Sequence, residues 1–234
     1  KAAKTSLKQD VSAHLKKATD FPIIAIGASA GGLETFTIFF KAISAKSNMA
    51  FVLITHLDPT HISLLPELLQ KSTKMIVKQV IDGMRLHPNT VYVIPPKADL
   101  EILNGVFQLF KQETPRGVKL PIDTFFHSLA KDQGSNAIGI ILSGTGTDGT
   151  LGIKTIKGEA GMVMVQTEES AKYDGMPHSA IATGLADYIL PPEKMPEQLV
   201  QYAARTALRA RGAESLLLDQ GELSNALQKI FILL

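Results

Sequence analysis

Short runs of apolar, mostly β-branched residues alternate along the chain with segments whose apolar residues recur at helical spacing. This alternation is typical of parallel strands connected by helices that cover both faces of a sheet. We therefore predict a doubly wound α/β fold with a mostly parallel sheet. The predicted strands are Ile23–Ala28, Phe51–Thr55, Val91–Ile94, Ala137–Leu142, Met162–Val165 and Asp187–Leu190.

The same pattern predicts helices and one antiparallel hairpin. A helix after Gly32 has one buried face, formed by Leu33, Phe36, Phe40 and Ile43. A second helix begins at Pro121 and runs to Asp132. Two apolar runs flank Asn104-Gly105, a pair that favours a tight turn between antiparallel strands. We therefore expect the hairpin to make the sheet mixed.

Composition limits the chemistry that the chain can perform. Its 234 residues include no Cys, which excludes disulfides, iron–sulfur clusters and Cys–zinc sites and leaves oxygen or nitrogen as the nucleophile. The net charge is only +2, and the first twenty residues contain five Lys against Asp10 and Asp20. No basic stripe remains for nucleic acid, and no apolar stretch reaches the roughly 20 residues of a membrane helix. We expect neither a nucleic-acid partner nor membrane insertion.

A candidate nucleophile lies where the first strand runs into its helix. The segment from Gly27 to Gly31 fits Gly-x-Ser-x-Gly with Ser29 at its centre. In that motif the Ser projects from a sharp turn, and small neighbours let backbone N–H groups approach a developing oxyanion. Alternatively, Ser29 only caps the helix and the glycines allow close packing. A phosphate-binding loop is not favoured, because the Lys-Ser/Thr pair of a P-loop is missing.

A candidate base directly follows the second strand. His56 comes at the carboxyl end of a buried-type strand, where open α/β sheets place ligand chemistry. Imidazole is the usual general base for a Ser hydroxyl, so pairing with Ser29 is the most economical hypothesis. A structural His, or a metal site with Asp58 and His61, is the alternative. No fourth ligand follows at a suggestive spacing.

A third small-residue loop, Ser143–Gly149, also joins a strand to a helix. Three of its glycines fit Gly-x-Gly-x-x-Gly: Gly144, Gly146 and Gly149. Glu168 and Glu169 follow at the distance that a dinucleotide site would require. Asp148 opposes that interpretation, because its carboxylate would repel a pyrophosphate. The same topology suits Asp148 as the acid that orients His56. A serine hydrolase, a dinucleotide-binding oxidoreductase and a catalytically silent interaction module therefore remain as hypotheses, and we favour the hydrolase.

With these segments the chain resembles the catalytic domain of the chemotaxis protein-glutamate methylesterases (CheB), from Phe21 to Val200. The matching motifs are Ile26–Gly32, Thr55-His56, Gly83-x-x-Leu86 to Val91–Pro95, Ser143–Gly149 and Gly175-Met176-Pro177. The resemblance implies a cytoplasmic hydrolase with no cofactor and no metal. Its substrates would be glutamate γ-methyl esters on chemoreceptor signalling helices, with glutamine deamidation as a related activity.

The resemblance also assigns the site residues. Ser29 would be the nucleophile, His56 the general base and Asp148 the acid that orients His56. Oxyanion and loop support would come from Ala30, Gly31 and Thr145. The family usually has Thr after the Ser and Met inside the Gly-x-Gly loop. Ala30 and Thr145 therefore alter the side-chain part of the oxyanion site and leave its backbone part.

We predict three parts of the chain: a tail or linker over residues 1–20, the catalytic domain over 21–200 and a helical linker over 201–234. One helical apolar stripe consists of Met195, Leu199, Tyr202 and Ala203, and another of Leu223, Leu227, Ile230, Phe231 and Leu234. The second stripe has no C-cap. Residues 227–234 are similar to the opening of the methyltransferase part of fused CheB/CheR-type hybrids. We therefore expect a C-terminal methyltransferase domain in the intact chain.

Overall fold

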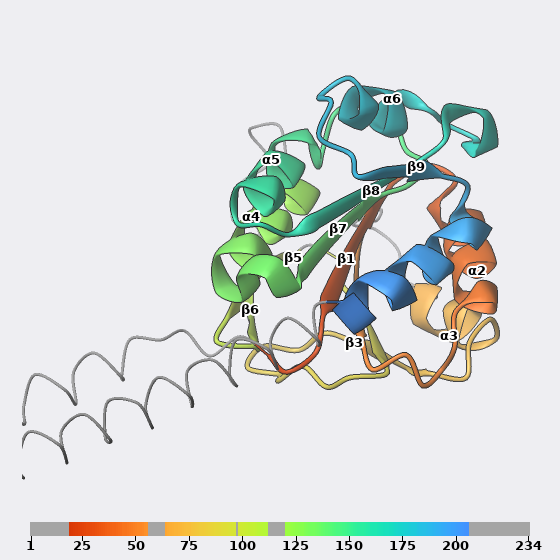
Figure 1. Cartoon of the computed structure of the whole chain (residues 1–234). Helices are drawn as coiled ribbons and strands as arrows, with labels where there is room; N and C mark the ends of the chain where they lie inside the picture. The colour runs from red at the N-terminus through yellow and green to blue at the C-terminus, as the bar shows by residue number, and fades with distance from the viewer. Residues whose placement is uncertain (1–18, 56–63, 97, 112–119, 206–234) are drawn as a thin grey trace, which may run out of the picture. The chain divides into compact units, whose positions relative to one another are not determined.

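The computed structural model describes residues 19–55, 64–96, 98–111 and 120–205 (Figure 1). The chain divides into two compact units, Lys1–Pro196 and Glu197–Leu234. Residues 195–205 are helical, with Met195 and Leu199 buried and Tyr202 and Ala203 half-buried, which confirms the first C-terminal stripe. The predictions for residues 1–18 and for the stripe from Leu223 to Leu234 lie outside the described residues.

Seven parallel strands form the main sheet, in the order β3-β4-β2-β1-β7-β8-β9. They are β1 (Ile23–Ala28), β2 (Ala50–Thr55), β3 (Ile76–Gln79), β4 (Thr90–Val93), β7 (Ala137–Ile141), β8 (Met162–Gln166) and β9 (Tyr188–Leu190). Each of the six predicted strands is confirmed to within one residue at either end. Sequence analysis missed β3, an edge strand whose residues are mostly exposed and which therefore lacks an apolar run.

Helices cover both faces of this sheet, which confirms the doubly wound α/β class. They are α2 (Gly32–Ala42), α3 (Leu65–Gln70), α4 (Pro121–Gln133), α5 (Thr150–Gly158) and α6 (Gly175–Ile181), with short 3-10 helices η1 (Gly134–Asn136), η2 (Glu168–Ser170) and η3 (Pro192–Lys194). Helices α4 and α5 lie on one side of the sheet, and α2 and α3 lie on the other (Figure 1). Strand β1 lies between β2 and β7 and is buried at every position. The carboxyl end of β1 is thus at the switch point where doubly wound folds place their sites.

The predicted hairpin is present, but it does not belong to the main sheet. Strands β5 (Ala98–Leu103) and β6 (Val106–Lys111) pair with each other, and β6 forms one isolated bridge to Arg85, but neither pairs with a strand of the main sheet. The seven-stranded sheet is therefore entirely parallel, and the expectation of a mixed sheet is wrong. Asn104 and Gly105 adopt φ angles of 53° and 70°, as the tight turn requires. The apolar side of the hairpin packs on α4, where the rings of Phe107 and Phe125 are 6.4 Å apart. Burial against a helix therefore replaces pairing with the main sheet.

The buried face of α2 differs from the prediction at one position. Phe36, Phe40 and Ile43 are buried as expected, but 42% of Leu33 is exposed. Leu33 is the second residue of α2 and lies in its first turn. Phe39 contributes to the core instead, and its ring is in edge-to-face contact with that of Phe40, with ring centroids 5.1 Å apart. Among the described residues, no helix combines the length and the apolar character needed to cross a membrane.

Candidate active site

Ser29 lies in the sharp turn between β1 and α2, as the motif predicts. It follows the last residue of β1, and α2 begins three residues later. The turn depends on Gly31, whose φ of 80° is a left-handed conformation that favours glycine. A Cβ atom on Gly31 would also lie 2.9 Å from the hydroxyl oxygen of Ser143. The small residues of the motif are therefore required by both backbone conformation and space.

The Gly-rich loop after β7 lies directly against this turn. The N–H of Ser29 donates to the carbonyl oxygen of Ser143 at 3.0 Å, which continues the β1–β7 pairing beyond the ends of the strands. A Cβ atom on Gly144 would lie 3.0 Å from both the backbone nitrogen and the Cβ of Ser29. Only a glycine at this position lets the two backbones approach so closely. The structure therefore brings together two motifs that are more than a hundred residues apart.

Ser143 connects three loops at this edge, a role that sequence analysis did not predict. Its side chain is fully buried, and its hydroxyl lies 3.0 Å from the carbonyl oxygen of Ala30. The same hydroxyl accepts the N–H of Tyr173 at 3.0 Å. The Ser143 N–H donates to Oε1 of the buried Gln166 at 2.8 Å. Ser143 therefore holds the nucleophile turn against the loop that precedes α6.

Backbone N–H groups are available beside Ser29. No described residue accepts a hydrogen bond from the N–H of Ala30, Gly31 or Thr145. Ala30 follows Ser29 at the N-terminal end of α2, where the helix dipole is positive. Thr145 follows Gly144, and its side chain is exposed to solvent. These N–H groups are the kind of donor that stabilises negative charge on a carbonyl oxygen during acyl transfer.

Asp148 lies at the same edge of the sheet, in the loop between β7 and α5. Only 3% of it is exposed. The N–H of Ile122 donates to its Oδ2 and the N–H of Asp123 to its Oδ1, both at 3.0 Å. Because each oxygen accepts an amide from the first turn of α4, the carboxylate is held in one orientation. This is the geometry required of a group that orients a second side chain.

Asp123 lies next to Asp148, in the first turn of α4. The position at a helix start predicts a solvated or capping group, yet only 9% of Asp123 is exposed. Its Oδ1 accepts the N–H of Gly152 at 2.6 Å, so it caps α5 and not its own helix. Burial, together with the nearby charge of Asp148, raises the pKa of Asp123, and the Gly152 N–H opposes this shift. No local pattern indicates this contact, because the two residues are 29 positions apart.

His56 lies outside the described residues, as do Asp58 and His61, so its part as general base stays a prediction. The residue before it, Thr55, pairs in the sheet with Ala28, the residue before Ser29. Of the predicted site residues, the structure brings Ser29, Ala30, Gly31, Thr145 and Asp148 to one sheet edge. The part of the chain that the structure describes contains no cluster of three or more His, Asp or Glu side chains suited to a metal ion.

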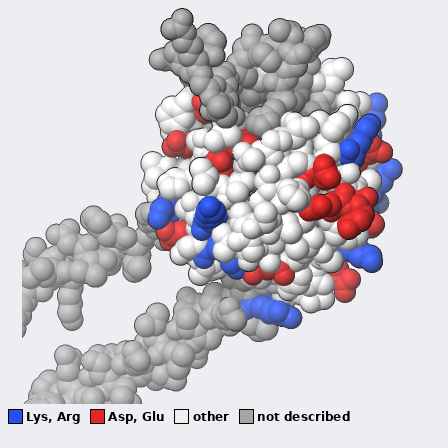
Figure 2. Space-filling view, turned by 90° about the horizontal axis from the view of Figure 1, so that it is seen from above, with Lys and Arg blue, Asp and Glu red and all other residues white. Residues whose placement is uncertain are grey.

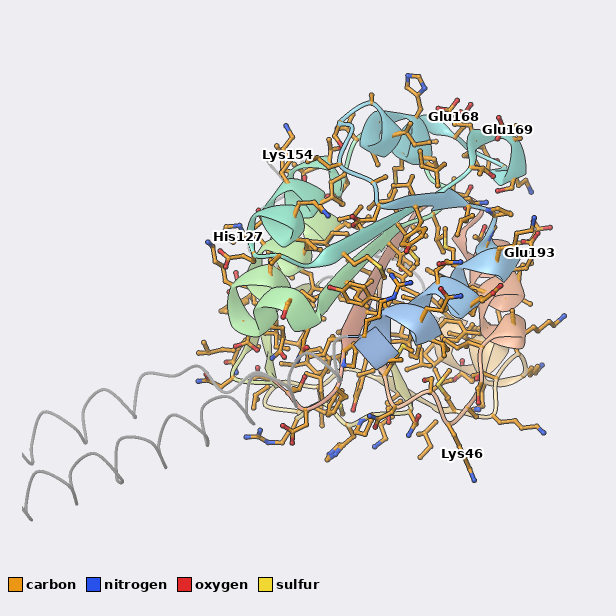
Figure 3. The ribbon with its side chains drawn as sticks, in the orientation of Figure 1. Lys46, His127, Lys154, Glu168, Glu169 and Glu193 are labelled. Atoms are coloured by element: carbon orange, nitrogen blue, oxygen red, sulfur yellow. The ribbon has the colours of Figure 1, made fainter. Side chains whose placement is uncertain are left out.

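One of the two acidic residues that a dinucleotide site would use contacts a histidine on α6. Glu168 and Glu169 lie beyond β8 at the end of the molecule that carries α6 (Figure 3). Oε1 of Glu168 lies 3.0 Å from Nδ1 of His178. Seen from above, this end has a broad uncharged surface at its centre; the largest group of acidic side chains lies on the right of the view, and other acidic and basic side chains lie around it (Figure 2). A surface of this kind does not favour a pyrophosphate.

Comparison with known proteins identifies the family of the chain. The family model described as CheB methylesterase matches residues 24–199. The chain belongs to the CheB methylesterase family. The crystal structure of the Thermotoga maritima CheB methylesterase catalytic domain superposes with a TM-score of 0.71 and 31% identity, covering 77% of this chain and 98% of that one. The family membership confirms the resemblance, and the matched structure confirms the α/β fold.

Several CheB relatives are longer than this chain. A protein-glutamate methylesterase/protein-glutamine glutaminase of Shewanella oneidensis is 34% identical over 210 residues, which are 87% of this chain and 59% of that protein. An uncharacterised 104.1 kDa protein of Rhodobacter capsulatus is 41% identical over 138 residues, 59% of this chain and 14% of that protein. The chain thus spans little more than half of the first of these relatives and a small part of the second.

Proposed function

We propose that this CheB family chain is a protein-glutamate methylesterase that hydrolyses glutamate γ-methyl esters on chemoreceptors through Ser29, His56 and Asp148. The contact between Gly144 and Ser29 carries the proposal. A Cβ on Gly144 would lie 3.0 Å from Ser29, so the loop backbone closes over the nucleophile where an oxyanion site is needed. The relatives named protein-glutamate methylesterase/protein-glutamine glutaminase support the choice of ester and of glutamine deamidation as a second activity.

The reaction has two halves. Oγ of Ser29 attacks the ester carbonyl carbon while the imidazole of His56 accepts the hydroxyl proton. The N–H groups of Ala30 and Thr145 stabilise the oxyanion of the tetrahedral intermediate. His56 returns the proton to the departing methoxide, so methanol leaves and an acyl-Ser29 ester remains. A water molecule, deprotonated by His56, then attacks this ester, and glutamate is released with the Ser29 hydroxyl restored.

The oxyanion site of this chain depends on the backbone. Ala30 has no side-chain donor, and the Thr145 side chain is exposed, so the N–H groups provide the stabilisation. Removing one oxyanion donor in a serine hydrolase costs about 100- to 1000-fold in kcat. The backbone donors therefore carry a large part of the expected rate.

We also propose the setting of the enzyme. The enzyme acts on the signalling helices of chemoreceptors in the cytoplasm and has no nucleic-acid partner. The intact chain continues into a methyltransferase domain. The length of the Rhodobacter capsulatus relative, of which this chain matches 14%, supports the presence of further domains. The similarity of residues 227–234 to the opening of a methyltransferase part supports the identity of the neighbouring domain.

Methanol release from methylated receptor helices tests the function. We expect release by this chain and no release by Ser29→Ala. A serine-directed sulfonyl fluoride should add one adduct to the intact mass of the wild-type chain and none to Ser29→Ala. Equal hydrolysis by the two proteins would reject the serine mechanism. Receptor binding without any methanol release would favour the silent interaction module.

A further inference from the structure

Two helix N-termini beside the candidate site are held by carboxylates that each belong to the other helical segment. Asp148, two residues before α5, accepts the N–H groups of Ile122 and Asp123 in the first turn of α4, both at 3.0 Å. Asp123, in that first turn, accepts the N–H of Gly152 in the first turn of α5 at 2.6 Å. The contacts form a closed ring, so neither carboxylate can shift without moving the segment that carries the other.

The ring is buried, and it places two acidic groups side by side. Only 9% of Asp123 and 3% of Asp148 are exposed. Burial and the charge of Asp148 both raise the pKa of Asp123, against the N–H groups of Gly149, Leu151 and Gly152. Capping a helix needs only one acceptor oxygen, which Ser or Asn supplies without a second buried charge. A carboxylate at this position therefore does more than cap α5.

We propose that Asp123 is a positioning residue for the hydrolytic reaction, which holds the segment from Asp148 to Gly152 so that the Asp148 carboxylate keeps one orientation. This role rests on the proposed function, in which Asp148 orients the general base. A carboxylate oxygen that accepts one amide can still accept an imidazole N–H. The direction of that second bond depends on where the first holds the carboxylate, and a misplacement of about 1 Å can cost about 100-fold in rate.

The test compares Asp123→Asn with Asp132→Asn. Asn keeps the size of the side chain and one acceptor oxygen. It replaces the other oxygen by an NH2 group, which is a donor and cannot accept an N–H of α5. Asp132 is a matched control: it lies on the same helix, is 7% exposed and accepts the N–H groups of Asn104 and Gly105 in the hairpin turn. Asp132→Asn should lower the melting temperature, and Asp123→Asn should lower it less, because Asp123→Asn also removes one of two neighbouring buried charges.

We expect Asp123→Asn to lower kcat for methanol release by about 10- to 100-fold with KM unchanged, as a misplaced catalytic group does, while Asp132→Asn keeps kcat within about twofold. Amide hydrogen exchange should become faster at residues 149–152 in Asp123→Asn only. If Asp123→Asn gives no melting transition, Asp123→Glu replaces it. Glu keeps the charge but displaces it by one methylene, so the same loss of kcat is expected.

The outcomes separate this role from the proposed function. A wild-type chain that releases no methanol overturns the proposed function. An active wild-type chain whose Asp123 variant retains full kcat, or loses no more than Asp132→Asn does, overturns only the positioning role. A rise in KM with unchanged kcat also overturns it, because a residue that positions the catalytic acid acts on the chemical step and not on substrate binding.

Discussion

Helix α4 has a buried carboxylate at each end, and the two ends differ in what they hold. At the N-terminal end, Asp123 accepts the N–H of Gly152 in the first turn of α5 and donates its own N–H to Asp148. At the C-terminal end, Asp132 accepts the N–H groups of Asn104 and Gly105 at 2.5 and 3.0 Å and so holds the hairpin turn. The two carboxylates are buried to a similar degree, and each accepts backbone N–H groups.

Their surroundings differ in charge. The side-chain neighbour of Asp132 is the neutral Gln133, whose Nε2 donates to Oδ2 at 2.7 Å. The acidic neighbour of Asp123 is Asp148, and its charge helps to raise the pKa of Asp123. Two buried like charges lower stability, and such arrangements are concentrated at functional sites. We infer that Asp132 serves stability at the hairpin end, whereas the pair of Asp123 and Asp148 at the other end lowers stability and fits the catalytic role that we propose for Asp148.

The largest effect is expected from neutralising Asp148, the carboxylate that we propose orients His56. Asp148→Asn keeps one oxygen for the amides of α4 but cannot hold His56 in the productive tautomer. We expect kcat to fall by about 10,000-fold, the loss known for such a change in a serine protease triad, with the far-UV circular dichroism unchanged. Methanol release measures the effect. A kcat within tenfold of wild type would show that Asp148 orients no base.

A second substitution tests the loops that surround Ser29. Ser143→Ala removes the hydroxyl between Ala30 and Tyr173, so the Tyr173 N–H is left without its acceptor. We expect a kcat lower by about 10- to 100-fold, because the nucleophile turn shifts, and a loss of about 0.5–1.5 kcal/mol in the free energy of unfolding, the net value of a typical hydrogen bond.

Ser128 supplies the control for this change at the hairpin side of α4. Its hydroxyl donates to the carbonyl oxygen of Phe125 at 3.0 Å and accepts the N–H of Ile102 at 3.2 Å. Ser128→Ala should lower stability by a comparable amount and leave kcat unchanged. If Ser143→Ala and Ser128→Ala lowered kcat equally, the loops around Ser29 would be no more important for activity than the hairpin side of α4.

The smallest expected effect is a pH dependence of stability. Because the pKa of Asp123 is raised above its usual 3.8 in the folded protein, the stability that this group contributes is complete below pH 3.8 and is lost as the pH rises through the folded-state pKa. Asp123→Asn does not titrate at this position. The free energy of unfolding of wild type minus that of Asp123→Asn should therefore decrease as the pH rises from 3.8.

Urea unfolding of both proteins at a series of pH values measures this difference. Asp132→Asn provides the comparison at the other end of α4. A difference between wild type and Asp123→Asn that grows with pH would mean that the Asp123 carboxylate is stabilised in its charged form. The contacts between α4 and α5 would then serve stability, as the contacts of Asp132 with the hairpin turn do.

Local sequence alone determined the class of fold and marked the small-residue loops that meet at the candidate site. Buried parallel strands are continuous apolar runs, so six strands can be identified without knowing their neighbours. Ser29 and the loop after β7 are marked by small residues, because a sharp turn and a close backbone approach both require them. Where local pattern was weak, prediction failed. The exposed edge strand β3 has no apolar run, and Leu33 looks like a core residue although it is exposed.

Only the tertiary structure decided which groups meet. The apolar residues of the hairpin were evident, but their burial on α4 and not in the main sheet depends on contacts with a distant helix. Ser143 meets Ala30 across 113 residues, and Asp123 meets Gly152 across 29. A hydroxyl or a carboxylate looks the same in sequence whether solvent or a buried amide surrounds it. Its role follows from desolvation and from its partners, and these exist only when the chain has folded.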